Sequence, residues 1–197
     1  MPTSTPLNSP VMRRLLARLD ANTAAAANGG RRSEILDTAD SIRERFFTMR
    51  KVSEPCAGSY WLINDLGWDD ITEFPRLDTT ETWSFVNLSG MMHPMHMHLV
   101  MFQVVNRQTY TYDGSTVTPT GEHIPPDPTE AGWKDTVRAE PGLITRVIAR
   151  FEDYTGLYPY HCHILEHEDH EMMRQFQALP PCPWDLDFDD KIGRAHV

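Results

Sequence analysis

The chain has 197 residues, of which 40% are hydrophobic, enough for one well-packed domain with an extra segment at either end. Its formal net charge is −10 at pH 7, and because an acidic surface repels nucleic acids and anionic membranes, neither is an expected partner. No apolar run approaches the roughly 18 residues that span a bilayer, and residues 1–6 lack the basic-then-apolar order of a signal peptide. With no targeting segment visible, the compartment stays open.

Residues 1–40 are rich in Pro, Ala, Asn and Gly, with one short helix-like stretch at 11–19 and a flexible run at 24–30. We expect a partly flexible inter-domain linker with a short helix. From residue 42 the chain changes to short stretches of aromatic and β-branched residues separated by turn signals. The predicted strands lie at 44–51, 60–63, 80–87, 98–107, 136–137, 143–151 and 157–161. This pattern predicts an all-β domain over 41–179, a Greek-key β-sandwich or barrel.

Two later segments are predicted to lie outside the sheets. The segment between Tyr110 and Trp133 contains several prolines, which exclude it from a central strand and favour a surface loop. Residues 180–197 are Pro-rich, then acidic, and without periodicity, so we expect a disordered tail whose last residues, 192–197, are artefactual. Three cysteines are too few for a disulfide framework, and whether Cys56 and Cys182 pair stays open.

Two clusters contain six of the nine histidines. The first is His93-Pro94-Met95-His96-Met97-His98, and the second is His161-Cys162-His163 followed by His167 and Met172. Imidazole, thiolate and thioether are ligands that suit copper, and two histidines with one cysteine and a weak axial methionine form a blue-copper site. A zinc site is the alternative for a His-Cys-His run, but zinc explains neither Met172 nor the first cluster. The sequence therefore predicts copper.

Strand parity divides these ligands between two sites, because neighbouring side chains of a strand point to opposite faces. Cys162 should point away from His161 and His163, and in an extended first cluster His93 should point away from His96 and His98. A mononuclear site would then take His93, Cys162, His167 and axial Met172. A second site would take His96, His98, His161 and His163. The peptide through Cys162 would join the two sites by a short covalent path.

The motifs His93-Pro94-x-His96-x-His98 with Phe102, and His161-Cys162-His163-Ile164-x-x-His167-x-x-x-x-Met172, resemble the C-terminal copper motifs of multicopper oxidases. Residues 131–136 and 161–169 resemble the branch that contains spore-coat laccase, bilirubin oxidase and phenoxazinone synthase. The resemblance covers residues 43–176 and implies a cupredoxin domain. We also expect a short helix near the segment from His167 to Met172.

The resemblance implies a role for each ligand. His93, Cys162, His167 and Met172 would hold the type 1 copper, His96 the type 2 copper, and His98, His161 and His163 the type 3 pair. Methionine at 172, where fungal laccases have a non-coordinating residue, implies a type 1 site of lower potential. Glu168 aligns with an acidic residue that could relay protons to the oxygen-reducing centre. The alternative for Glu168 is a solvated acid within the surrounding acidic run.

The chain departs from the family in lacking the N-terminal pair of His-x-His motifs, and neither His123 nor His170 is expected to replace it. We therefore expect a fragment that lacks the N-terminal cupredoxin domains, or a subunit completed by another chain, inactive in isolation. The expected reaction couples one-electron oxidation of a phenolic or diphenol-type donor to reduction of dioxygen to water. Alternatives are a stand-alone blue-copper electron-transfer cupredoxin and a copper-storage domain with vestigial sites. The methionines around the first cluster are expected mainly as core filler.

Overall fold

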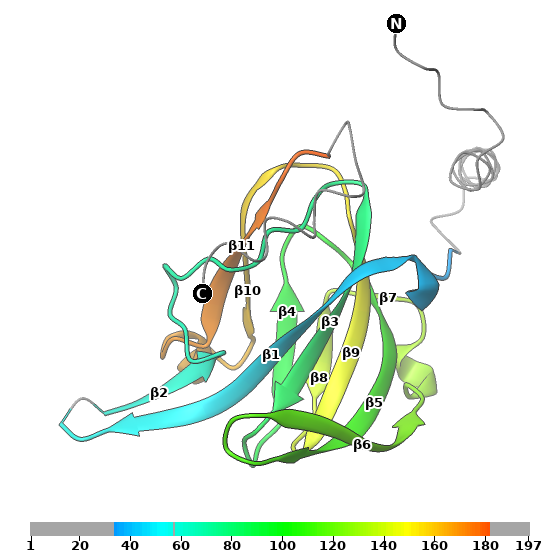
Figure 1. Ribbon diagram of the computed structural model, residues 1–197. Coiled ribbons are helices and arrows are strands. Elements are labelled where there is room, and N and C mark those ends of the chain that lie inside the picture. The colour runs from blue at the N-terminus through cyan, green and yellow to red at the C-terminus, as the bar shows by residue number, and fades with distance from the viewer. Residues whose placement is uncertain (1–33, 57, 182–197) are drawn as a thin grey trace, which may run out of the picture. The chain divides into compact units, whose positions relative to one another are not determined.

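The computed structural model describes residues 34–56 and 58–181 (Figure 1). The expected helix at 11–19, Cys182 and nearly all of the predicted linker and tail lie outside these residues. Within the described part, the fold is mostly β and consists of two sheets, as the sequence predicted. No helix among the described residues is long and apolar enough to cross a membrane.

The larger sheet has the strand order β2-β1-β3-β9-β5-β6, with β7 also paired to β5. Its strands are β1 (Ser41–Glu54), β2 (Gly58–Ile63), β3 (Thr79–Asn87), β5 (Phe102–Tyr112), β6 (Val117–Ile124), β7 (Trp133–Lys134) and β9 (Leu143–Phe151). Strand β1 runs parallel to β3, whereas its other neighbour, β2, is antiparallel. The β1–β2 hairpin extends as an arm beyond the other strands (Figure 1).

The smaller sheet has the order β11-β10-β4-β8. Its strands are β4 (His93–Met97), β8 (Thr136–Ala139), β10 (Gly156–Cys162) and β11 (Met173–Ala178). The remaining elements are the 3-10 helices η1 (Thr38–Asp40) and η2 (Pro128–Glu130) and one short helix, α2 (Leu165–Glu168). The short helix expected near His167 is therefore present.

The core is an aromatic cluster contributed by strands of both sheets. Trp83 of β3 lies at its centre, with ring centroids 4.6 Å from Phe47, 5.2 Å from Tyr160 and 5.6 Å from Phe176. All four side chains are fully buried. Burial of large aromatic side chains supplies much of the hydrophobic stabilisation of a domain this size. The same packing fixes β10, the strand that ends at Cys162, against the larger sheet.

A buried ion pair ties the segment before β3 to the smaller sheet. Arg174 of β11 is fully buried, donates to the hydroxyl of Tyr160 at 2.8 Å and lies 3.2 Å from a carboxylate oxygen of Glu73. The same guanidinium donates to the carbonyl oxygen of Asp70 and the hydroxyl of Thr72. A buried charge is tolerated when it is paired and hydrogen-bonded, as here.

Four strands, β4, β6, β7 and β11, were missing from the sequence prediction, and β5 begins later than predicted. Strand β4 precedes the strand predicted at 98–107, which begins only at Phe102, because Leu99 has a positive φ of 68° that interrupts the extended backbone. Strand β11 was missed because the buried position of Arg174 hides its alternating pattern. The surface loop predicted between Tyr110 and Trp133 is wrong for residues 117–124, which form β6. Strand β6 is an exposed edge strand, and edge strands tolerate proline.

Candidate metal centre

Strands β4 and β10 lie side by side and carry the two histidine motifs. In their antiparallel register His161 is opposite His96, and Cys162 is opposite Met95. Because side chains alternate along both strands, the ligands separate into two groups on opposite faces. The first cluster is His93, Cys162 and His167, and the second cluster is His96, His98 and His161. In each cluster the ligand atoms lie within 4.8 Å of one another.

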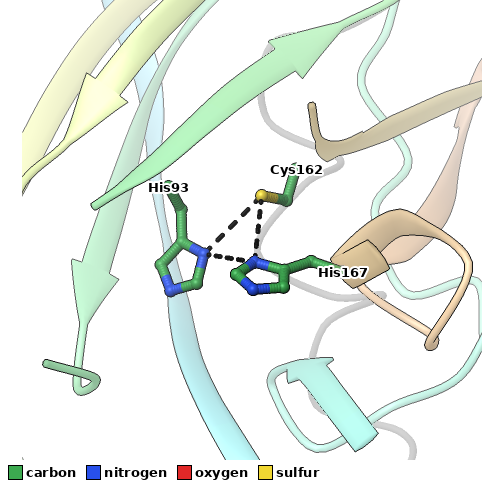
Figure 2. Close-up of side chains that lie close together, drawn as sticks. All are labelled: His93, Cys162 and His167. Carbon is green, nitrogen blue, oxygen red and sulfur yellow. Dashed lines mark hydrogen bonds between the residues drawn. The ribbon is translucent and has the colours of Figure 1, made fainter. Parts of the chain in front are cut away.

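The first cluster is compact, with the side chains of His93, Cys162 and His167 pointing toward one another (Figure 2). The Sγ atom of Cys162 lies 3.6 Å from Nδ1 of His93 and 3.6 Å from Nδ1 of His167, and the two Nδ1 atoms are 3.2 Å apart. The exposed fraction is 0% for His93 and Cys162 and 5% for His167. Three donor atoms facing one point, away from water, form a ready set of metal ligands.

Loop contacts orient His93 at the start of β4. Its Nε2 atom lies 2.8 Å from the hydroxyl of Ser89, so a proton on Nε2 leaves the lone pair of Nδ1 free for a metal. Ser89 is itself held by the side chain of Asn87, which receives hydrogen bonds from the Ser89 amide and hydroxyl. Asn87 is fully buried and also donates to the carbonyl oxygen of Ala139. A hydrogen-bonded loop thus fixes the tautomer and direction of this imidazole.

Helix α2 and the turn after it bring His167 and Met172 to Cys162. The amide of Met172 donates to the carbonyl oxygen of His167 at 2.9 Å, and the amide of Cys162 donates to the carbonyl oxygen of Met172 at 3.0 Å. Between them Glu171 adopts a positive φ of 72°, which reverses the chain direction. Met172 is fully buried in the same core as Cys162.

Burial sets the protonation of the first cluster. It lowers the pKa of His93 to about 4, with a contribution from His167, and lowers the pKa of His167. Both imidazoles are therefore neutral near pH 7, the form that binds metals. Burial also raises the pKa of the Cys162 thiol to about 11. Because a thiolate is the ligand form, a cation that binds here must displace this proton. Two neutral imidazoles and one thiol fit copper.

The second cluster is more open. The Nε2 atoms of His98 and His161 lie 3.3 Å apart, and the ring of His163 lies 5.4 Å from that of His161 and 5.6 Å from that of His96. Nδ1 of His96 lies 2.8 Å from the carbonyl oxygen of Asp135. A proton on Nδ1 would donate to this oxygen and leave the lone pair of Nε2 free for a metal. His161 is buried, whereas His98 and His163 are exposed. All four histidines named for the second site therefore lie together.

Glu168, at the end of α2, contacts His161 of the second cluster. Its Oε2 atom lies 3.2 Å from Nδ1 of His161, which also contacts the carbonyl oxygen of Cys162 at 3.1 Å. This carboxylate oxygen is buried and accepts no hydrogen bond from the described residues. Glu168 thus lies beside the second cluster, at the position for which the sequence left a proton relay and a solvated acid as alternatives.

Trp61 is a neighbour of the first cluster that the sequence did not single out. Its indole ring lies 4.2 Å from the ring of His167, tilted by 31°, and meets His93 edge-on at 5.1 Å. The sequence placed Trp61 in a strand but held no signal that the β1–β2 arm reaches the ligands. By contrast, neither His123 nor His170 belongs to a cluster among the described residues. Met95 and Met97 are core residues, whereas Met91, Met92 and Met101 are exposed.

Comparison with known proteins agrees with this arrangement. A family model described as "Multicopper oxidase" matches residues 54–181. The laccase of Bacillus subtilis strain 168 is 43% identical over 125 residues, which cover 61% of this chain and 24% of that laccase. The bilirubin oxidase of Albifimbria verrucaria is 36% identical over 128 residues, which cover 61% of this chain and 20% of that enzyme.

A solved multicopper oxidase from the hyperthermophile Aquifex aeolicus shares the fold, with a TM-score of 0.60 and 24% identity over 76% of this chain and 32% of that one. The chain thus spans about a quarter of the length of the laccase and less of the bilirubin oxidase. The matched segment includes both clusters, and copper is the metal that the family and the His/Cys/Met set imply. The chain therefore belongs to the multicopper oxidase family, as a copper-binding cupredoxin domain homologous to the C-terminal domain of bacterial laccases and bilirubin oxidase.

Proposed function

We propose that this chain is the domain of a laccase-like oxidase at which a phenolic or diphenol-type donor is oxidised, and that it contributes half of the ligands of an oxygen-reducing centre. The observation that carries the proposal is the back-to-back placement of the two clusters on β4 and β10, with Cys162 in one cluster and its neighbour His161 in the other. The activity of the whole oxidase is part of the proposal, because the chain spans only part of its relatives.

Each ligand has an assigned place in the proposal. His93, Cys162, His167 and Met172 would hold type 1 copper, His96 type 2 copper, and His98, His161 and His163 the type 3 pair. Bound copper would supply one-electron oxidation of the donor at the first cluster and four-electron reduction of dioxygen to water at the second. The protein keeps water from the first cluster by burial, and the peptide bonds from Cys162 to His161 and His163 connect the two sites covalently.

The second cluster needs ligands from elsewhere. The chain contains no further His-x-His pair, and the exposed His98 and His163 leave this face open to a partner. Completion by the N-terminal cupredoxin domains of the same oxidase, or by another chain, would supply the missing imidazoles. The isolated chain is accordingly expected to bind copper at the first cluster and to be inactive towards oxygen.

Glu168 is proposed as the proton relay of the second cluster. Oxygen reduction consumes protons, and a carboxylate 3.2 Å from Nδ1 of His161 with one buried, unsatisfied oxygen is suited to hold and pass them. Its position in α2, directly after His167, places it between the ligands of the first cluster and His161 in the sequence of contacts.

A stand-alone electron-transfer cupredoxin is the second candidate function. It is favoured by the first cluster, whose ligands all come from this chain. Such a protein has no use for four gathered histidines on the opposite face, which is why the oxidase is preferred.

The test is anaerobic copper loading of the purified chain, with absorption spectra, a copper count per chain and oxygen uptake. An intense blue thiolate-to-copper band that disappears in Cys162→Ser, with about one copper bound and no oxygen uptake, is the expected result. His123→Gln, which changes a histidine outside both clusters, should keep the band. Absence of the band in the wild-type chain would refute the assignment of the first cluster to type 1 copper. Oxygen uptake by the chain alone would refute the proposal that the second cluster needs ligands from elsewhere.

A further inference from the structure

A cavity of about 620 Å³ lies beside the first cluster, against the base of the β1–β2 arm. Trp61 and Ser89 line it, and each also contacts a ligand of the first cluster: Trp61 packs on His167, and Ser89 contacts His93. A molecule in this cavity is thus separated from the ligand imidazoles by a single side chain. Cavities of this size accept small aromatic compounds.

The walls of the cavity are aromatic. Besides Trp61, the lining includes Tyr110 and Tyr112. Both tyrosine hydroxyls are already engaged, one by the carbonyl oxygen of Asn87 at 2.5 Å and the other by that of Gly114 at 2.8 Å. The rings therefore offer the cavity apolar surface for stacking and not hydroxyl groups for specific recognition.

Two cations line the same cavity, and within the described part of the chain only Arg50 of the two has an ion-pair partner. Arg50 donates to both carboxylate oxygens of Asp65, which offsets its charge. The Nζ atom of Lys51 lies 5.7 Å from the centroid of the Trp61 ring, and no carboxylate among the described residues forms an ion pair with Lys51. Lys51 is exposed, so it can turn towards a bound anion.

We propose that this cavity binds aromatic donors that carry a carboxylate, with Trp61 stacking on the donor ring and Lys51 selecting the negative charge. The inference rests on the proposed function, since it names the class of donor used at the first cluster. The net charge of the chain is −10, which disfavours the approach of anions in general. The positive charge of Lys51 makes this cavity locally attractive to them. Lys51 is thus a specificity-determining residue, and Trp61 is the residue that brings the donor against His167.

The test uses the full chain without copper, labelled with nitrogen-15, so that binding is measured independently of any oxidase activity. The indole N–H signal of Trp61 is assigned by its loss in Trp61→Phe. The chain is titrated with 4-hydroxybenzoate and with the uncharged, similarly shaped 4-hydroxybenzamide. We expect both probes to shift the Trp61 signal, and the anion to bind roughly two- to five-fold more tightly, the range that one exposed ion pair supplies.

Two charge variants locate the selectivity. Lys51→Gln should abolish the preference for the anion. In the wild-type chain, added salt should make the affinities for the two probes more nearly equal. Lys134→Gln, a matched change in β7 away from the cavity, should alter neither affinity. Equal affinities in the wild-type chain, a preference that survives Lys51→Gln, or a Trp61 signal that neither probe moves would each overturn the proposal.

A further variant separates the two cations. Loss of the preference in Arg50→Gln with retention in Lys51→Gln would assign selection to Arg50 and contradict the proposal. Copper loading of the same samples keeps the two proposals distinguishable. A missing blue band with intact anion preference would refute the oxidase assignment alone, and the reverse pattern would refute only the donor class.

Discussion

The backbone amide of Cys162 donates a 3.0 Å hydrogen bond to the carbonyl oxygen of Met172, so two residues ten positions apart are joined without any metal. The carbonyl oxygen of His167 accepts from the amide of Met172 in the same turn. Backbone hydrogen bonds therefore hold these three residues together independently of the side chain at position 172. A change of the side chain at position 172 should leave the other ligands in place.

Met172→Leu is expected to keep the blue band and to raise the reduction potential of the copper, because the weak axial thioether is removed. The exchange nearly conserves volume, so the free energy of unfolding should fall by less than about 1.5 kcal/mol. A redox titration that follows the band measures the effect. Met101→Leu, at an exposed position, is the control. An unchanged potential in Met172→Leu would exclude Met172 as the axial ligand.

Ser89→Ala should weaken copper binding, since the Ser89 hydroxyl lies 2.8 Å from Nε2 of His93 and directs Nδ1 towards the metal. Loss of such a supporting contact typically lowers metal affinity by roughly 10- to 100-fold. Competition with a chelator of known affinity measures this change. Ser53→Ala on the exposed β1–β2 arm should bind copper like the wild type. Equal affinities for both variants would mean that Ser89 does not orient His93.

Tyr160→Phe should destabilise the copper-free chain by about 1–3 kcal/mol. The buried hydroxyl donates to Glu73 at 3.0 Å and accepts from Arg174 at 2.8 Å, so its removal leaves both charged groups short of a partner. Urea denaturation gives the free energy of unfolding. Tyr154→Phe, at a residue that is 70% exposed, should change stability by less than about 0.5 kcal/mol. Equal stability of the two variants would show that the buried network contributes nothing.

Glu130→Gln should lower stability by about 1–3 kcal/mol near pH 7 and by progressively less in acid. Arg107 donates to both carboxylate oxygens of Glu130, which holds the pKa of Glu130 below its ordinary value of 4.5. The stabilisation that the ionised Glu130 contributes is therefore fully present above pH 4.5. It is lost as the pH falls through the lower pKa of Glu130 in the folded state.

Denaturation at a series of pH values measures the difference between wild type and Glu130→Gln. Glu122→Gln, at an exposed position of β6, is the control and should change stability by less than about 0.5 kcal/mol near pH 7. A difference for Glu130→Gln that stays constant into acid would contradict the sign of the pKa shift.

The composition of the ligand set was predictable from the sequence. The alternation of His161, Cys162 and His163 follows from the geometry of any extended strand, so their division between two faces needed no tertiary information. The residue types alone indicated copper. The same local patterns predicted most of the strands and the all-β class, whereas β11 was hidden because its alternating buried positions begin with a charged residue, Arg174.

The tertiary structure decided which ligands meet and what surrounds them. His93 and Cys162 are 69 residues apart and come within 3.6 Å because β4 pairs with β10. The approach of Trp61 to His167 depends on how the β1–β2 arm leaves the sheet, and the ion pair of Arg174 with Glu73 joins segments about a hundred residues apart. The side chain of each residue and the alternation of its strand are local properties of the chain. Contacts between strands arise only when distant apolar surfaces are buried together, which no local pattern specifies.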